Sequence, residues 1–185
     1  MQRSASQTVG PFFLEALIHG GDEIIAKPGT PGETIILEGR VLDAEGSAVT
    51  DALLEISQAD TTGRYVADSA EARSGLRFTG FGRAATDNLG KFRFTTVYPG
   101  VAHAEDRNRD APHLDVMVFA RGLLKPLVTR IYFEGHAGNA HDPVLAEVPE
   151  SRRSTLEARR ASLASAVWEF DVRLQGHDET VFFDF

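Results

Sequence analysis

The sequence contains no cysteine, which excludes disulfide bonds, thiolate nucleophiles and cysteine-ligated zinc sites. This fits a protein of the reducing cytoplasm, which is the location we expect. The chain also lacks an apolar stretch of the roughly 20 residues that a spanning helix needs, so we expect no membrane partner. No run of lysine and arginine breaks a formal net charge of -8, and we therefore expect no nucleic-acid partner.

The sequence indicates one β-rich domain. Its 185 residues are 42% hydrophobic, enough to bury a full core. Several short segments alternate apolar and polar residues, as strands with one buried face do. The segments are "TIILEGRVLDAEGSAV", "DALLEISQAD", "AATDNLGKFRFTTV", "HLDVMVFA", "PLVTRIYF" and "SAVWEFDVRLQG". They predict a mostly β fold with an antiparallel β-sandwich-like core.

The sequence predicts little helix. The best candidate is "ESRRSTLEARRASL", which has good helix formers but a weak apolar stripe. "DPVLAEVPE" predicts one short helical turn, with Pro143 near its start. We therefore expect few and short helices.

The two ends of the chain differ from the middle. Residues 1–33 show no strand pattern yet contain Phe12, Phe13 and Leu17, so we predict an extended N-terminal arm that packs on the core or on a partner. The sandwich domain would then span residues 34–185. The last residues, "VFFDF", are aromatic where a solvated tail is usually polar.

His113 and Asp115 stand two residues apart at the start of a predicted strand, so their side chains point to the same face. Such a pair is one way to begin a metal site. It is also an ordinary polar pair at a strand entrance. The residues alone leave both interpretations open.

The segments "QTVGPFF", "DALLEISQADTTGRY", "FTGFGRAATDNLGKFRFTTVYPG", "APHLDVMVFARGLLKPLVTRIYF", "DPVL" and "FDVRLQGHDETVFFD" resemble, in order, those of the intradiol ring-cleaving dioxygenases. The resemblance covers nearly the whole chain and implies a β-sandwich-like core. Within the family, the chain resembles more closely the α chains of those members that are built from two kinds of chain.

The resemblance also implies what this chain has lost. Catalytic members bind ferric iron through two tyrosinates and two histidines. The position of the first tyrosine is Ala102, and no tyrosine occurs between Val101 and Leu114 to supply the second. Of the histidine pair, His113 is kept and the second place is Asp115, while a supporting arginine has become Asp110. We therefore expect a degenerate metal site and no metal in this chain.

A family member that does not bind iron is expected to act together with a second chain that does. The resemblance suggests a non-catalytic α subunit that completes the pocket of a homologous β chain, whose Fe(III) cleaves a small aromatic acid with O2. Thr8, Gly10 and Pro11 would line that pocket, because glycine lets backbone approach a ligand and proline fixes its path. The alternative is a simple turn that docks the arm.

Arg130 is the other candidate for substrate binding. A guanidinium in a predicted strand between apolar neighbours needs a partner, and the carboxylate of an aromatic acid would fit its planar fork. The alternative partner is a structural carboxylate, such as Glu134 or an acid from elsewhere in the chain. Catalytic members have a neutral polar side chain here, so Arg130 could also fill the lost iron site.

Two other functions stay open. One is a stand-alone metalloenzyme with a divergent site around His113 and Asp115. The other is a non-enzymatic β-sandwich binding module that shares only the core pattern. Iron in the isolated chain would favour the first, and purification without a related second chain would favour the other.

Overall fold

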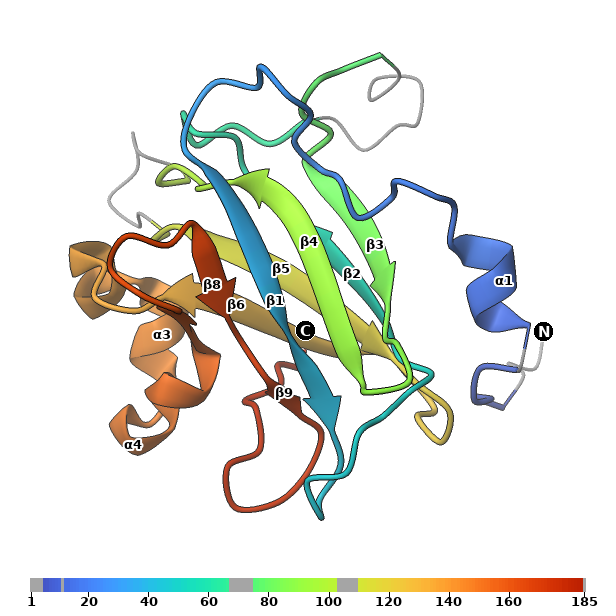
Figure 1. The fold of residues 1–185 in the computed structure, drawn as a ribbon. Helices are drawn as coiled ribbons and strands as arrows, with labels where there is room; N and C mark the ends of the chain where they lie inside the picture. The colour runs from blue at the N-terminus through green and yellow to red at the C-terminus, as the bar shows by residue number, and fades with distance from the viewer. Residues whose placement is uncertain (1–4, 11, 67–74, 103–109, 185) are drawn as a thin grey trace.

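A single curled sheet wraps around the core of the molecule (Figure 1). The computed structural model describes residues 5–10, 12–66, 75–102 and 110–184. In these residues nine strands form the sheet, in the order β3-β2-β5-β6-β7-β8-β1-β4, with β9 paired to β1. The strands are β1 (Thr34–Leu42), β2 (Leu53–Ser57), β3 (Phe81–Ala85), β4 (Lys91–Val97), β5 (His113–Phe119), β6 (Leu127–Phe133), β7 (Glu157–Arg160), β8 (Val167–Glu169) and β9 (Val172–Arg173).

Helices are few and short, as predicted. Among the residues described, they are α1 (Phe13–Leu17), α3 (Pro143–Glu147) and α4 (Glu150–Arg153), with 3-10 turns η1 (Ala137–His141) and η2 (Ser154–Leu156). Figure 1 shows α1 on one side of the sheet and α3 and α4 on the opposite side. The part of the chain that the structure describes contains no helix long and apolar enough to cross a membrane.

The sheet is mixed, so the prediction of an antiparallel arrangement is wrong for three strand pairs. Strand β1 pairs antiparallel with β4 but parallel with β8 and β9, and β6 pairs parallel with β7. Parallel neighbours need a crossover connection, and the segment that forms α3 and α4 supplies it between β6 and β7. Alternation within a strand predicts its faces but not the direction of its neighbour.

Strand β1 depends on a glycine where another segment crosses it. A Cβ at Gly39 would lie 1.7 Å from the carbonyl oxygen of Phe170, so only glycine allows this approach. Around this contact lies the core, which includes the fully buried Leu37 and Phe94.

The prediction of a helix over the 14 residues of "ESRRSTLEARRASL" is correct only for the start of this segment. Glu150–Arg153 is helical, but Glu157–Arg160 is strand β7. Its residues are good helix formers, yet pairing with β6 on one side and β8 on the other overrides that preference. The short turn in "DPVLAEVPE" is confirmed as α3, with Pro143 in its first turn and Asp142 as its cap.

The N-terminal segment makes contacts with its own chain. The ring of Phe13 lies 5.5 Å from that of Phe119 on β5, whereas Phe12 is 72% exposed. Further along, Ile25 is fully buried and its backbone N–H donates to the carbonyl of Thr95. At the other end, Phe183 pairs with Val128 of β6, so part of the aromatic tail also packs on its own sheet.

Candidate functional site

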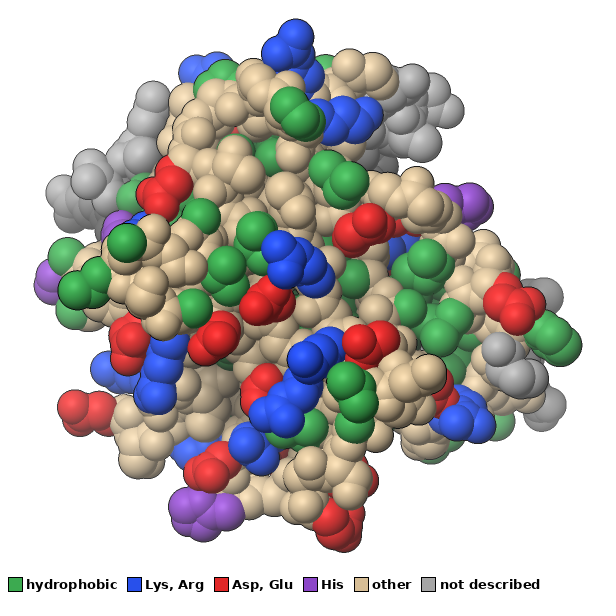
Figure 2. Space-filling view, viewed as in Figure 1, with side chains coloured by type: hydrophobic (Ala, Val, Ile, Leu, Met, Phe, Trp, Pro, Cys, Tyr) green, Lys and Arg blue, Asp and Glu red, His purple; other side chains and the backbone are tan. Residues whose placement is uncertain are grey.

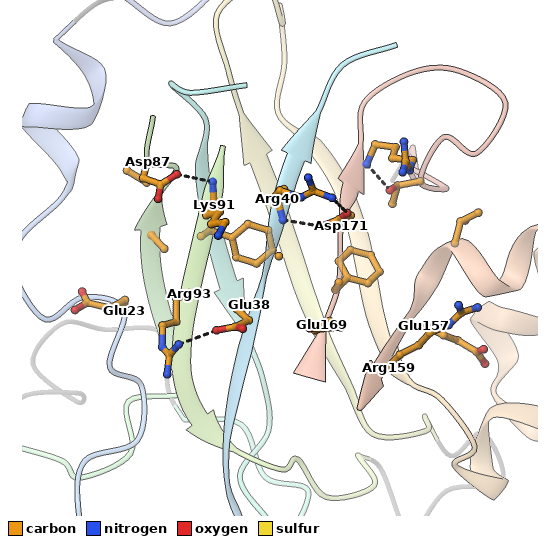
Figure 3. A pocket seen from close by; sticks show the side chains of 18 of the residues that line it. Glu23, Glu38, Arg40, Asp87, Lys91, Arg93, Glu157, Arg159, Glu169 and Asp171 are labelled. Atoms are coloured by element: carbon orange, nitrogen blue, oxygen red, sulfur yellow. Dashed lines mark hydrogen bonds and ion pairs between the residues drawn. The ribbon is translucent and has the colours of Figure 1, made fainter. Parts of the chain in front are cut away.

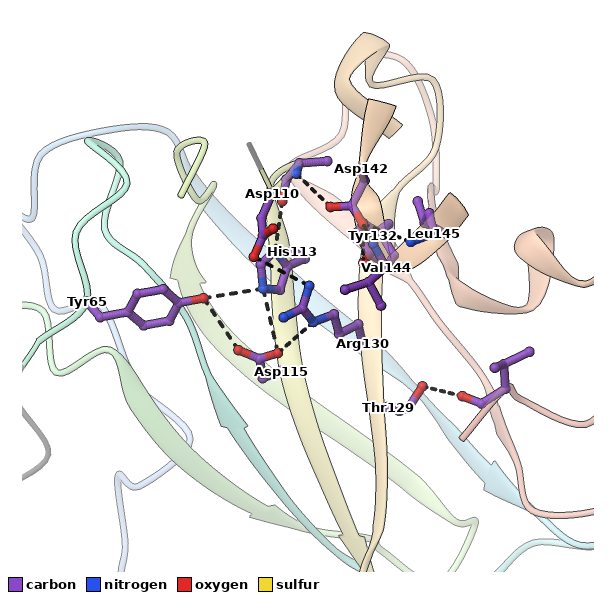
Figure 4. Close-up of polar contacts among 12 residues, drawn as sticks. Tyr65, Asp110, His113, Asp115, Thr129, Arg130, Tyr132, Asp142, Val144 and Leu145 are labelled. Atoms are coloured by element: carbon purple, nitrogen blue, oxygen red, sulfur yellow. Dashed lines mark hydrogen bonds and ion pairs between the residues drawn. The ribbon is translucent and has the colours of Figure 1, made fainter. Parts of the chain in front are cut away.

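The predicted site residues of β5 and β6 form one polar cluster on the outer face of the sheet (Figure 4). The strand register places Asp115 opposite Arg130 and His113 opposite Tyr132. Nε of Arg130 donates to Oδ1 of Asp115 at 3.0 Å, and its Nη1 lies 3.6 Å from Oδ2 of Asp110. The partner of Arg130 is thus a structural carboxylate, while Glu134 pairs with Arg159 instead.

His113 is buried with a defined orientation. Its Nδ1 lies 2.7 Å from the carbonyl oxygen of Ala111, which can only accept, so Nδ1 carries a proton. Nε2 then faces the cluster, 3.3 Å from the hydroxyl of Tyr65 and 3.6 Å from Oδ1 of Asp115. The histidine therefore presents one ring nitrogen to the polar cluster.

Tyr65 is the residue that sequence reasoning missed. It lies 48 residues before His113, and its hydroxyl donates to Oδ2 of Asp115 at 3.4 Å. The turn that carries it is ordered by Asp60, whose carboxylate accepts from the backbone N–H groups of Thr62 and Arg64. The motif "DTTGRY" contained this turn signal, but nothing in it indicates which strand the tyrosine approaches.

The charges of the cluster shift the pKa values of its members. Burial alone would raise the pKa of Asp115, but its contacts with His113 and Arg130 outweigh burial and hold that pKa below the usual range. Burial and the negative charge of Asp115 raise the pKa of Tyr65, so its phenol is neutral at pH 7. Burial opposes the charge of Arg130, yet Tyr132, Asp115 and Asp110 hold its pKa above the ordinary value.

A buried carboxylate, outside the cluster itself, bonds to residues that neighbour it. Asp142, only 1% exposed, accepts hydrogen bonds from the hydroxyl of Tyr132 and the backbone N–H of Ala111. It also caps α3 through the N–H groups of Val144 and Leu145. This one side chain therefore joins β6, the start of α3 and the segment that leads into β5.

The donor set does not fit the iron site that the family resemblance implies. Ala102, at the position of the first tyrosine, is buried and bridges to Asp110. Tyr98 packs on the rings of Phe133 and Trp168, against the core. In the described residues, no three His, Cys, Asp or Glu side chains are grouped as a metal site requires.

The predicted arm residues lie elsewhere on this face. The hydroxyl of Thr8 accepts from the backbone N–H of Gly122, after the end of β5, at 2.7 Å. Gly10 is exposed at a small cavity of about 240 Å³, lined also by Phe13 and Arg121. Pro11 lies outside the described residues. Within this chain, the structure does not bring the arm residues together with the Arg130 cluster.

A cleft of about 1260 Å³ is on a different face, over β1, β4 and β8 (Figure 3). Two ion pairs join charged side chains that line it, Arg93 with Glu38 and Arg40 with Asp171. Figure 2 shows both signs of charge interspersed over this face. Such cross-strand pairs are typical of a solvated sheet surface, and the cleft adds no candidate chemistry.

Comparisons with known proteins agree with the fold. The family model described as Dioxygenase matches residues 8–176. The solved dioxygenase domain of a dioxygenase carbohydrate-binding protein fusion from Streptomyces sp. SirexAA-E has a TM-score of 0.66 and 24% identity. That match covers 83% of this chain and 87% of the other. The chain belongs to the intradiol ring-cleaving dioxygenase family, whose members are oxidoreductases.

Within the family, the chain is similar along its whole length to an α chain. It is 44% identical to the protocatechuate 3,4-dioxygenase alpha chain of Burkholderia cepacia, over 100% of this chain and 98% of that one. It is also 36% identical to the protocatechuate 3,4-dioxygenase beta chain of Burkholderia cepacia, over 90% of this chain and 75% of that one. The chain is thus related to both kinds of subunit.

Proposed function

We propose that this chain is the non-catalytic, iron-free α subunit of a cytoplasmic protocatechuate 3,4-dioxygenase. A homologous β chain would hold Fe(III) and use O2 to cleave protocatechuate to 3-carboxy-cis,cis-muconate, a step in aromatic catabolism. The observation that carries the proposal is the guanidinium of Arg130 between Asp110 and Asp115, in the region where the family resemblance locates iron. The full-length similarity to an α chain supports the same role.

The other two functions are less well supported. A stand-alone metalloenzyme at His113 and Asp115 would need further donors at the same point, and the nearest charged group is the cation of Arg130. A binding module that shares only the core pattern does not account for family similarity that extends through the arm, the loops and the tail.

The arm supports a role as a pocket wall. A Cβ added at Gly10 would meet no atom within 4 Å, so this chain by itself does not require glycine there. A requirement for bare backbone would therefore come from a ligand or a partner chain. Phe12, beside it, exposes 72% of its surface, which is typical of an apolar contact with a second chain. We propose that Thr8, Gly10 and Pro11 line the substrate pocket of the β chain.

For Arg130, the contacts favour a side chain that fills the lost iron site over one that binds the substrate. It pairs with Asp115 and Asp110, and its side chain is 15% exposed. Phe119, on which the arm packs, lies four residues beyond Asp115, or about 13 Å at the rise of a strand. A single aromatic acid does not span that distance. We propose that Arg130 fills the lost iron site and that the arm alone reaches the substrate.

The first test is the composition of the purified enzyme. The full-length chain, expressed alone and again with a homologous β chain, is analysed for iron content, visible absorption and turnover of protocatechuate. We expect iron, a ferric-phenolate band and activity only in the two-chain complex. Stoichiometric iron with activity in the chain expressed alone would contradict the proposal, and so would failure to associate with any β chain.

The second test concerns the pocket wall. Gly10→Val in the two-chain complex should preserve assembly and raise the KM for protocatechuate, because a branched side chain intrudes where bare backbone is needed. Gly20→Val is the matched control, since a Cβ at Gly20 also meets no atom within 4 Å. An unchanged KM in intact Gly10→Val complex would make the arm a structural clasp only.

A further inference from the structure

Arg130 is surrounded by groups that serve as metal ligands in other proteins. Its Nε is 3.0 Å from a carboxylate oxygen of Asp115, and its Nη1 is 3.6 Å from one of Asp110. Nε2 of His113 and the hydroxyl of Tyr65 lie next to Asp115, at 3.6 and 3.4 Å from its oxygens. Carboxylate, imidazole and phenol oxygen or nitrogen atoms are donors that first-row metals accept.

His113 is oriented as metal-binding histidines usually are. Its side chain is 2% exposed, and its Nδ1–H donates to the carbonyl of Ala111. In histidine ligands, the N–H of the second ring nitrogen commonly donates a hydrogen bond to a backbone carbonyl, which fixes the tautomer and directs the other nitrogen at the ion. Here that other nitrogen, Nε2, faces Tyr65 and Asp115.

The guanidinium supplies charge rather than a complete set of hydrogen bonds. Nη1 of Arg130 is buried, and it has no hydrogen-bond partner in the part of the chain that the structure describes. It lies near Asp110 at ion-pair distance only. A second cation placed among these donors would sit close to the guanidinium in a partly buried site and be repelled by it.

We infer that the Arg130 guanidinium is the resident cation of this cluster and excludes metal ions from a site that Tyr65, His113, Asp110 and Asp115 would otherwise form. The arginine stands between the two carboxylates, so the donors do not meet at one point while it is present. The inference rests on the proposal that Arg130 fills the lost iron site, and it does not depend on whether the arm lines a partner's pocket.

The test is calorimetric titration of Zn²⁺ into the full-length chain, in the assembly with which it purifies. Arg130→Leu removes the cation and is expected to bind one more Zn²⁺ per chain than the wild type. The affinity of Arg130→Leu for Zn²⁺ at this site should exceed that of the wild type by about 100-fold or more, because the guanidinium no longer repels the ion or stands between its ligands. Arg130→Gln is a second neutral variant, which tests the same point if the leucine variant does not fold.

Two controls separate charge from packing. Arg130→Lys keeps a cation and should not gain Zn²⁺ binding, while Arg130→Leu combined with Asp115→Asn should lose what the single variant gained. The inference is overturned if neither neutral variant binds Zn²⁺ more tightly than the wild type, or if Arg130→Lys binds as tightly as Arg130→Leu. Wild-type binding that Asp115→Asn abolishes would also overturn it. None of these measurements uses activity, so they fail or succeed separately from the proposed subunit role.

Discussion

The hydroxyl of Tyr132 donates a hydrogen bond of 3.0 Å to Oδ1 of Asp142, and both side chains are buried. The tyrosine is on β6, directly opposite His113, and the aspartate begins α3. This contact ties the crossover helices to the strand pair that holds the polar cluster. The geometry of the cluster therefore depends on a carboxylate outside it.

We expect Asp142→Ala to lower the free energy of unfolding by about 3 kcal/mol, because buried donors of Tyr132, Ala111 and α3 lose their acceptor. Urea denaturation of the variant measures this loss. Asp87→Ala is the control: Asp87 also accepts two backbone N–H bonds, but at an exposed turn. Equal losses in the two variants would show that burial of Asp142 adds nothing.

The depressed pKa of Asp115 gives stability a defined pH dependence. A carboxyl group with a lower pKa in the folded state stabilises the fold above its unfolded pKa, about 3.9, and this contribution is lost as the pH falls through the folded value. Between about pH 5 and pH 3, wild-type stability should therefore fall more steeply than that of Asp115→Asn. Thermal unfolding of both proteins across this range tests the expectation, and parallel curves would contradict it.

Gly39→Ala should prevent or severely weaken closure of the sheet at β1. The added methyl group would lie 1.7 Å from the backbone oxygen of Phe170, and neither backbone segment can move aside without losing strand pairing. We expect a loss above about 3 kcal/mol, or no soluble folded protein. Gly20→Ala, which meets no atom within 4 Å, should have nearly wild-type stability in the same denaturation experiment.

Phe13 should anchor the arm to its own chain, because its ring packs on that of Phe119. Phe13→Ala is expected to increase amide hydrogen exchange in residues 5–18 with a loss of global stability of about 1 kcal/mol. Phe12→Ala is the matched control, since Phe12 is 72% exposed and should leave exchange in the isolated chain unchanged. If Phe12→Ala loosens the arm as much, the assignment of the anchor is wrong.

The parts of the fold that could be predicted are those that local alternation determines. Strand β4 and most of β5 show period-two burial, and their sequences alternate accordingly. Strand β7 could not be predicted, because "EARR" favours helix and only its pairing with β6 and β8 makes it extended. The parallel direction of β8 and β9 against β1 likewise depends on residues far away in the chain.

The same limit applies to the site. A shared face for His113 and Asp115 follows from strand geometry, and their contact confirms it. The approach of Tyr65 and the ion pair between Arg130 and Asp110 depend on how a turn and two strands meet in space. The family resemblance indicated which positions had changed, but not that a guanidinium would lie between the two carboxylates.

The parallel pairing of β1 with β8 and β9 has a consequence for biosynthesis. Arg40 on β1 donates its backbone N–H to Asp171, which lies 131 residues later in the chain. At 5 to 20 residues per second, roughly 7 to 26 seconds of translation separate the two. During this time one edge of β1 stays unpaired and able to join a strand of another molecule. The ribosome-bound chain is therefore most exposed to aggregation just before its last strands emerge.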